Sequence, residues 1–179
     1  MKTLTILRHA KSSWSNAALP DEERPLNPRG ERDAPVMAAR INDAGIRPSL
    51  IMSSPAVRAW ATAKIVAKAI SYPIEFLHRE DELYLASLER LLDLFARQDN
   101  AFNSVMVVGH NPGLTEFANY LLPDVTDNIP TCGLVVLDID TDNWDLRQRK
   151  QAELILYDFP KIVDPKRGQA APTPSTRAR

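Results

Sequence analysis

Short apolar runs alternate along this chain with segments in which apolar residues recur every three or four positions. The first pattern is typical of buried strands and the second of amphipathic helices. Strands are predicted over 3–7, 50–53, 74–77 and 104–108. Helices are predicted over 29–44, 54–70, 88–95 and 112–122. This alternation indicates an α/β fold in which helices cover both faces of a parallel sheet.

Proline, glycine and serine are expected to set the ends of these helices. Pro35 predicts that the first regular helix begins just before it, because proline is tolerated in a first turn. Gly45 is expected to end that helix. Ser54 is predicted to cap the second helix, with Pro55 at its first position. The stretch 10–28, which is broken by three prolines, is expected to form a loop.

Two further apolar runs, 134–139 and 153–157, flank a polar stretch at 140–145. A turn in that stretch would pair the runs as an antiparallel hairpin at one edge of the sheet. The sequence therefore predicts a three-layer αβα sandwich whose sheet is mostly parallel with an antiparallel edge. We expect one domain over 1–160, and we expect 161–179 to be disordered because it holds few apolar residues.

Composition is that of a globular protein: of 179 residues, 44% are hydrophobic and 25% are charged. The net charge of −1 gives no long-range attraction to nucleic acid or to an anionic membrane. No apolar stretch approaches the roughly 20 residues of a membrane span, and we expect a cytoplasmic protein. The single cysteine, Cys132, excludes an intramolecular disulfide and a multi-cysteine metal site.

Two of the three histidines directly follow predicted strands: His9, which is preceded by Arg8, and His110. Because the carboxyl ends of parallel strands share one edge of a sheet, where ligands bind, we expect the two histidines to meet there. Arg58 is expected near the same edge, in the first turn of the second helix. Two arginines, two histidines and a helix N-terminus predict a phosphate pocket that needs no metal or other cofactor.

Other chemically capable residues are expected to be structural. A lone histidine after a strand is more often a structural hydrogen-bonding residue than a nucleophile, but the joint pattern favours function for His9 and His110. His78 is predicted to lie on the surface. Cys132 is predicted to be a buried, inert thiol. Trp14 and Trp60 are interpreted as packing residues.

The sequence resembles the histidine phosphatases, also called the phosphoglycerate mutase-like superfamily. In that family a first strand ends in Arg-His-Gly and a later strand ends in Gly-His. The matching residues here are Arg8-His9-Ala10 and Gly109-His110. Between them, RPLNPRGERDA resembles the Leu-Thr-x-x-Gly-x-x-x-Ala segment, and SSPAVRAWATA resembles the Ser-Ser-x-x-x-Arg-x-x-x-Thr-Ala segment. The resemblance implies a phosphoglycerate mutase-like fold.

Within the superfamily, the string RHAKSSW and the compact length are most similar to SixA-type phosphohistidine phosphatases. Their substrate phosphate is carried on a histidine of another protein. The resemblance implies that His9 is the nucleophile and becomes transiently phosphorylated. It implies that Arg8, Arg58 and a protonated His110 hold the phosphoryl oxygens. Ser12 keeps a hydroxyl where the family has threonine and is expected to bind phosphate.

The group that protonates the leaving group is the open question of this mechanism. Family members that act on alcohol phosphates supply a carboxylic acid from the segment after the central helix. Glu82 is the candidate here and Asp81 the second, while the alternative is a solvated acidic loop. Phosphohistidine needs such an acid less, because an imidazole leaves in neutral form once its distal nitrogen is protonated.

The leading hypothesis is a metal-independent phosphatase that acts through a phosphohistidine intermediate on His9. Its expected substrates are histidine-phosphorylated proteins. One alternative is a phosphatase of small phosphate esters, and the other is a phosphate-binding module without turnover.

Overall fold

The computed structural model describes residues 1–148 and 151–160, so the disorder predicted for 161–179 lies outside the described residues. Within these ranges six strands form one sheet in the order β3-β2-β4-β1-β5-β6. The strands are β1 (Lys2–Arg8), β2 (Leu50–Ser53), β3 (His78–Arg79), β4 (Ser104–Gly109), β5 (Leu134–Ile139) and β6 (Ala152–Asp158). The helices are α1 (Pro28–Asp43), α2 (Val57–Ala69), α3 (Leu88–Ala96) and α4 (Gly113–Leu121).

The sheet is parallel from β3 to β1 and antiparallel from β1 to β6. β1 pairs in parallel with β4, and β2 lies in parallel between β4 and β3. β5 pairs antiparallel with β1, and β6 pairs antiparallel with β5. The predicted antiparallel hairpin is confirmed. Because Arg8 lies opposite Gly109, the residues that follow β1 and β4 emerge at the same end of the sheet.

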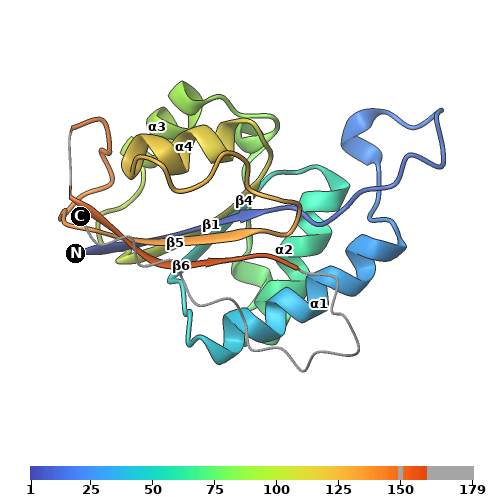
Figure 1. Cartoon of the computed structure of the whole chain (residues 1–179), viewed down its shortest axis with the longest axis horizontal. Coiled ribbons are helices and arrows are strands. Elements are labelled where there is room, and N and C mark those ends of the chain that lie inside the picture. The colour runs from blue at the N-terminus through green and yellow to red at the C-terminus, as the bar shows by residue number, and fades with distance from the viewer. Residues whose placement is uncertain (149–150, 161–179) are drawn as a thin grey trace.

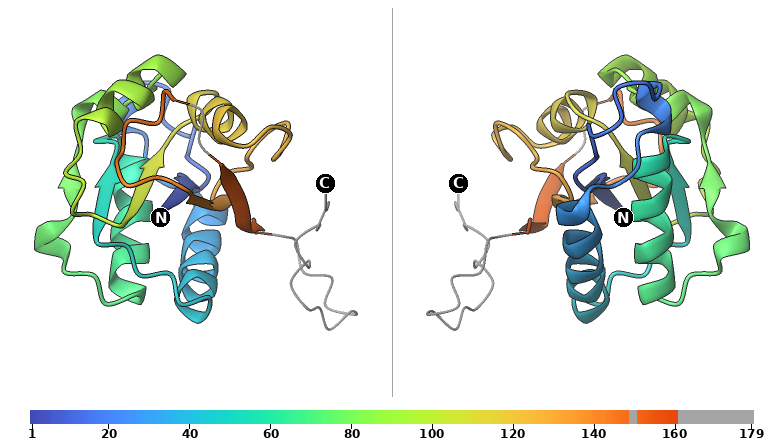
Figure 2. Two further views of the ribbon diagram at one scale, coloured as in Figure 1. Left: turned by 90° about the vertical axis from the view of Figure 1, so that its left-hand side faces the viewer. Right: turned by 90° about the vertical axis from the view of Figure 1, so that its right-hand side faces the viewer.

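Helices cover the two faces of the sheet in pairs, α1 and α2 on one face and α3 and α4 on the other (Figures 1 and 2). Side chains of β1 alternate between the two layers, as the period of a strand requires. Leu4 and Ile6 lie in the core under α3 and α4, and Leu7 lies in the core under α1 and α2. Each such buried side chain contributes about 1.5–3 kcal/mol through apolar burial. The three-layer αβα prediction is confirmed.

Helix α1 begins at Pro28, earlier than predicted. The side-chain oxygen of Asn27 accepts the N–H of Gly30 at 2.8 Å, which caps the helix, and Pro28 follows at the first helical position. Pro35 lies inside the helix rather than in its first turn, so the prediction that the helix starts just before it is wrong. Gly45 follows the end of α1 with φ of 71°, the left-handed conformation expected of a helix stop.

The N-terminus of α1 packs tightly on the loop that follows His9. A Cβ on Gly30 would lie 2.2 Å from the main-chain oxygen of Lys11, so no other residue fits without a backbone shift. That same oxygen accepts the N–H of Asn27 at 2.9 Å. The match of this glycine to the family segment therefore has a packing reason.

The prediction of a strand over 74–77 is wrong. Ile74–Phe76 forms a 3-10 turn, closed by a hydrogen bond from the N–H of Phe76 to the oxygen of Pro73 at 3.0 Å. The apolar side chains of Ile74 and Phe76 are exposed, so the apolar run at 74–77 does not mark a buried strand. The strand lies directly after the predicted range, where His78 and Arg79 pair with β2.

Of the helices in the described ranges, none has both the length and the apolar character that crossing a membrane requires.

Candidate active site

The two predicted site histidines meet at the end of the sheet. His9 follows β1, His110 follows β4, and their ring centroids are 5.1 Å apart. Both side chains are buried, with 8% and 4% of each residue exposed. The N–H of His9 donates to the oxygen of Gly109 at 3.1 Å, so the backbones as well as the rings are held together.

His9 has the tautomer that a nucleophilic imidazole needs. Its Nδ1 lies 2.7 Å from the carbonyl oxygen of Ala10, and because a carbonyl only accepts, Nδ1 carries the proton. Nε2 therefore keeps its lone pair. Burial is the main reason that the pKa of His9 falls from 6.5 to about 4; the hydrogen bond to Ala10 opposes this shift, and the charges of Arg58 and Arg8 add to it. His9 is neutral across the physiological pH range.

His110 is held by Ser54. Its Nε2 lies 2.7 Å from the Ser54 hydroxyl oxygen, while its buried Nδ1 has no partner among the described residues. Burial, followed by the electrostatic interactions with His9 and Arg58, lowers the pKa of His110 to about 3. This favours a neutral ring, in contrast to the protonated His110 expected from the sequence. A neutral imidazole still offers one N–H donor.

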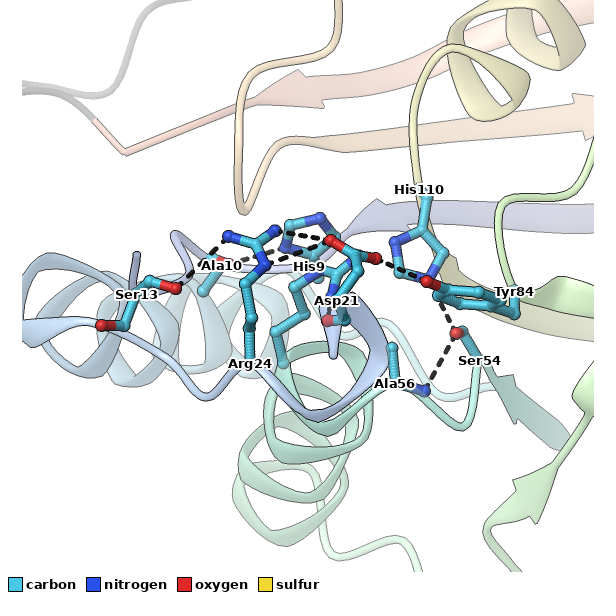
Figure 3. Close-up of polar contacts among 10 residues, drawn as sticks. His9, Ala10, Ser13, Asp21, Arg24, Ser54, Ala56, Tyr84 and His110 are labelled. Atoms are coloured by element: carbon cyan, nitrogen blue, oxygen red, sulfur yellow. Dashed lines mark hydrogen bonds and ion pairs between the residues drawn. The ribbon is translucent and has the colours of Figure 1, made fainter. Parts of the chain in front are cut away.

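Ser54 does not cap α2 as predicted. The helix starts at Val57, and its N-cap residue, Ala56, makes no side-chain capping bond. The Ser54 hydroxyl instead accepts the N–H of Ala56 at 3.2 Å and contacts His110 (Figure 3). Ser54 thus contacts a site histidine instead of capping the helix.

Arg8 and Arg58 each have part of the guanidinium bound and part left without a partner. Arg8 donates from Nη1 to the oxygen of Ile129 at 2.8 Å. Arg58, which is 3% exposed, donates from Nη1 and Nη2 to Asp21. The Nε atoms of both arginines are buried without a hydrogen-bond partner in the described part of the chain. Buried donors of this kind are rare, so these are the atoms that an anion would satisfy.

Asp21 is a site residue that the sequence reading missed. It lies in the 3-10 turn Asp21–Glu23 between β1 and α1. Its carboxylate accepts hydrogen bonds from Tyr84 at 2.5 Å, from Arg58 at 2.9 Å and from Arg24 at 3.1 Å (Figure 3). These contacts, that of Tyr84 first, lower the pKa of Asp21 to about 2. The carboxylate is ionised at neutral pH.

Tyr84 and Arg24 were also missed. The Tyr84 ring meets the His110 ring edge-on at a centroid distance of 5.6 Å. The Arg24 guanidinium lies 3.5 Å from the centroid of the Trp14 ring and donates to the Ser13 oxygen at 3.3 Å. Trp14 is 73% exposed, so its interpretation as a packing residue is wrong. The partly buried Trp60 packs against the core beneath α1 and α2.

No hydrogen bond or ion pair connects Glu82 or Ser12 to either histidine in the described part of the chain. The Glu82 carboxylate is paired with Arg97, which follows α3, and no hydrogen bond or ion pair links it to the site residues described above. Ser12 is buried in the loop after β1, where its backbone bridges to Leu26. Its hydroxyl makes no hydrogen bond to any residue in the described ranges. The roles assigned to Glu82 and Ser12 stay predictions, as does that of the exposed Asp81.

The remaining expectations concern inert positions. Cys132 is buried, as predicted, and burial raises the pKa of its thiol to about 12, which disfavours the reactive thiolate. His78 is exposed and lies 3.3 Å from Glu80, as predicted for a surface residue. Within residues 1–148 and 151–160, no group of three His, Cys, Asp or Glu side chains is placed to hold a metal ion.

Comparison with known proteins identifies the family. Residues 4–102 match the model of the histidine phosphatase superfamily, branch 1. An uncharacterized chloroplastic protein of Arabidopsis thaliana is 29% identical over 154 residues, which are 80% of this chain and 69% of that protein. SixA of Agrobacterium tumefaciens, assigned as a phosphohistidine phosphatase, is 30% identical with a TM-score of 0.74, over 89% of this chain and 99% of its own.

A second solved structure, the protein histidine phosphatase SixA complexed with tungstate, is 21% identical with a TM-score of 0.71. The match covers 87% of this chain and 95% of that one, and it shows a shared fold. The family match, the αβα sandwich and the histidine pair agree with one another. This chain belongs to the histidine phosphatase superfamily, in its branch 1, and is a phosphatase-type hydrolase similar to the SixA proteins.

Proposed function

We propose that this protein dephosphorylates phosphohistidine in other proteins through a covalent phosphohistidine on His9. One observation carries the proposal. Of the four buried side-chain polar atoms without partners in the described residues, three are nitrogens of Arg8, Arg58 and His110. They belong to the residues that accompany His9, whose Nε2 keeps a free lone pair. A phosphoryl group beside His9 would supply acceptors for all three.

In the first step, Nε2 of His9 attacks phosphorus. A bond forms between phosphorus and Nε2 while the bond from phosphorus to the substrate nitrogen breaks. The electron pair leaves with the substrate imidazole, which departs in neutral form because its distal nitrogen carries a proton. Arg8 and Arg58 hold the phosphoryl oxygens and stabilise their charge during the transfer.

In the second step, water attacks the phosphorus bound to His9. The bond to Nε2 breaks, His9 returns to the neutral tautomer with its proton on Nδ1, and the proton of water leaves with inorganic phosphate. The hydrogen bond from Nδ1 to Ala10 is available throughout, so the ring keeps its orientation in both steps. No metal ion takes part in either step.

The carboxylates near the site favour phosphohistidine over alcohol phosphates. Asp21 has a pKa of about 2 and cannot donate a proton at neutral pH, and Glu82 is paired with Arg97. An alkoxide leaves poorly without an acid, whereas an imidazole that is already protonated needs none. The similarity to SixA of Agrobacterium tumefaciens supports the same substrate class. Phosphate esters with good leaving groups, such as aryl phosphates, are the second candidate substrates on this argument.

The test compares hydrolysis of a histidine-phosphorylated carrier protein with hydrolysis of a panel of alkyl phosphates. We expect a kcat/KM for the phosphoprotein at least about 100-fold above that for any alkyl phosphate, which corresponds to the usual contribution of general acid catalysis. His9→Ala should abolish hydrolysis of both, while His78→Ala, a change at an exposed position, should not. Rapid acid quench with labelled substrate should trap an acid-labile phosphoenzyme. Faster turnover of alkyl phosphates, or substantial activity of His9→Ala, would refute the proposal.

A further inference from the structure

The two site arginines share one pattern: protein acceptors take terminal nitrogens and leave Nε without a partner. Arg8 donates from Nη1 to a main-chain carbonyl, that of Ile129. Arg58 donates from Nη1 to the main-chain oxygen of Asp21 at 2.6 Å and from Nη2 to its carboxylate at 2.9 Å. A guanidinium has five N–H groups, and Asp21 accepts two of those of Arg58. Among the three that remain, Nε–H and the second N–H of Nη2 form one edge that can bind a ligand.

Asp21 is itself fixed from three directions. Arg58 comes from α2, Arg24 follows the turn that holds Asp21, and Tyr84 follows the 3-10 turn Asp81–Leu83. One carboxylate oxygen accepts the Nε–H of Arg24 and lies 3.1 Å from Nη2 of the same arginine, and the other accepts hydrogen bonds from Arg58 and Tyr84. A carboxylate has about four acceptor positions, and three of them accept hydrogen bonds from the protein. Asp21 is therefore suited to holding other groups rather than to contacting substrate.

We propose that Asp21 is a positioning residue for phosphoryl transfer, which holds the terminal edge of Arg58 so that its Nε edge faces the phosphoryl oxygens beside His9. The proposal rests on the proposed function, in that His9 receives a phosphoryl group. A side-on pair of N–H donors matches two oxygens of the transferring group, and fixed donors act best in the transition state.

Asp21 has a second effect through its charge. Arg8, Arg24 and Arg58 are cations, both histidines are neutral, and Asp21 is the carboxylate bound to two of these arginines. Without that charge, Arg24 and Arg58 become unpaired cations that attract an anion in more than one orientation. Loss of Asp21 should therefore weaken catalysis and tighten the binding of inorganic phosphate, the product. Loss of a residue with a merely structural role would weaken both catalysis and phosphate binding.

The test uses Asp21→Asn in the full chain, with Glu22→Gln as the matched control, since Glu22 is an exposed carboxylate in the same turn. For Asp21→Asn, kcat on an aryl phosphate should fall about 10- to 100-fold, the effect expected of one hydrogen bond to a charged group. The inhibition constant of inorganic phosphate should fall about two- to fivefold, which means tighter binding. Glu22→Gln should change neither by more than about twofold, as is usual for surface substitutions.

A parallel fall of kcat and of phosphate affinity in Asp21→Asn would overturn the proposal, and so would no change in kcat. Tyr84→Phe provides a second variant, because it removes one hydrogen bond from the carboxylate and keeps its charge. It should lower kcat about two- to fivefold and leave phosphate binding unaltered. An unaltered kcat would again refute the positioning role. Because the assay uses an aryl phosphate, its outcome is distinct from failure of the phosphohistidine substrate.

Discussion

Lowering the pH from 7.5 to 5.0 should destabilise this protein through its buried histidine pair. The pKa of His9 is about 4 and that of His110 about 3, against 6.5 in an unfolded chain. The unfolded state therefore binds more protons below pH 6.5. The stability that comes from keeping each ring neutral is fully present above pH 6.5. It is lost as the pH falls toward about 4 for His9 and about 3 for His110.

The size of the loss follows from these pKa values. One pH unit corresponds to about 1.4 kcal/mol per proton, so each histidine loses about 2 kcal/mol between pH 6.5 and 5.0. The pair together loses about 4 kcal/mol, a large part of the 5–15 kcal/mol typical of a folded domain. Asp21, with a pKa of about 2 instead of 3.8, acts in the same direction at lower pH. At or above pH 5, the measured loss of stability therefore contains the contribution of the histidines without that of Asp21.

Guanidinium chloride unfolding at pH 7.5 and 5.0 measures this loss directly. The native protein should lose about 4 kcal/mol between the two pH values, and His9→Gln and His110→Gln about 2 kcal/mol each, because each variant keeps one titrating ring. Each variant is compared with itself at the two pH values, so any destabilisation by the substitution cancels. His78→Gln controls for the removal of an exposed histidine. Equal stability of the native protein at both pH values would refute the buried neutral pair.

Three further predictions concern the acid, the metal and the packing. Glu82→Gln should change kcat on phosphohistidine substrate by less than about threefold, whereas a fall of 10²–10⁴-fold would make Glu82 the general acid. Preincubation with EDTA should leave the hydrolysis rate unchanged, because arginines supply the positive charge, and a requirement for added divalent ions would contradict this. Gly30→Ala should lose about 1–3 kcal/mol in unfolding experiments, because its Cβ would lie 2.2 Å from the Lys11 oxygen. Gly109→Ala, whose Cβ would meet only Leu114 at 3.7 Å, should lose less, and an equal loss would refute the packing argument.

The sequence predicted the sheet and the histidine pair because both depend on local patterns. Apolar runs mark β1 and β4, and strand pairing then brings together the residues that follow them, His9 and His110. Helix ends were predicted less well, since Ser54 has the composition of a cap but its hydroxyl is taken by His110. The helical pattern over 29–44 places the start of α1 within one residue of Pro28, whereas the preference of proline for a first turn, applied to Pro35, places it too late. Asn27 and Pro28 provide the usual signal for the start of a helix.

Asp21, Arg24 and Tyr84 could not be predicted from local pattern. They lie in irregular segments, and the contact between Asp21 and Tyr84 joins residues far apart in the chain. An Asp in a polar loop is ordinarily a solvated charge, and only the fold reveals that this one binds Arg58. The same limit applies to Glu82: its position in the sequence resembles that of the family acid, while its partner, Arg97, is set by how the segment packs against α3.

The backbone of His9 is anchored on both sides. Its N–H donates to Gly109 at the end of β4, and its carbonyl accepts the N–H of Cys132, just before β5, at 2.9 Å. His9, the proposed nucleophile, thus belongs to the hydrogen-bonded centre of the sheet rather than to a loop that opens on its own. Amide exchange at His9 and Cys132 requires the central strands to separate, so it reports the most stable cooperative unit of the fold. We therefore expect His9 to have no locally frayed form, so that catalytic activity and the core of the sheet should disappear in the same unfolding transition.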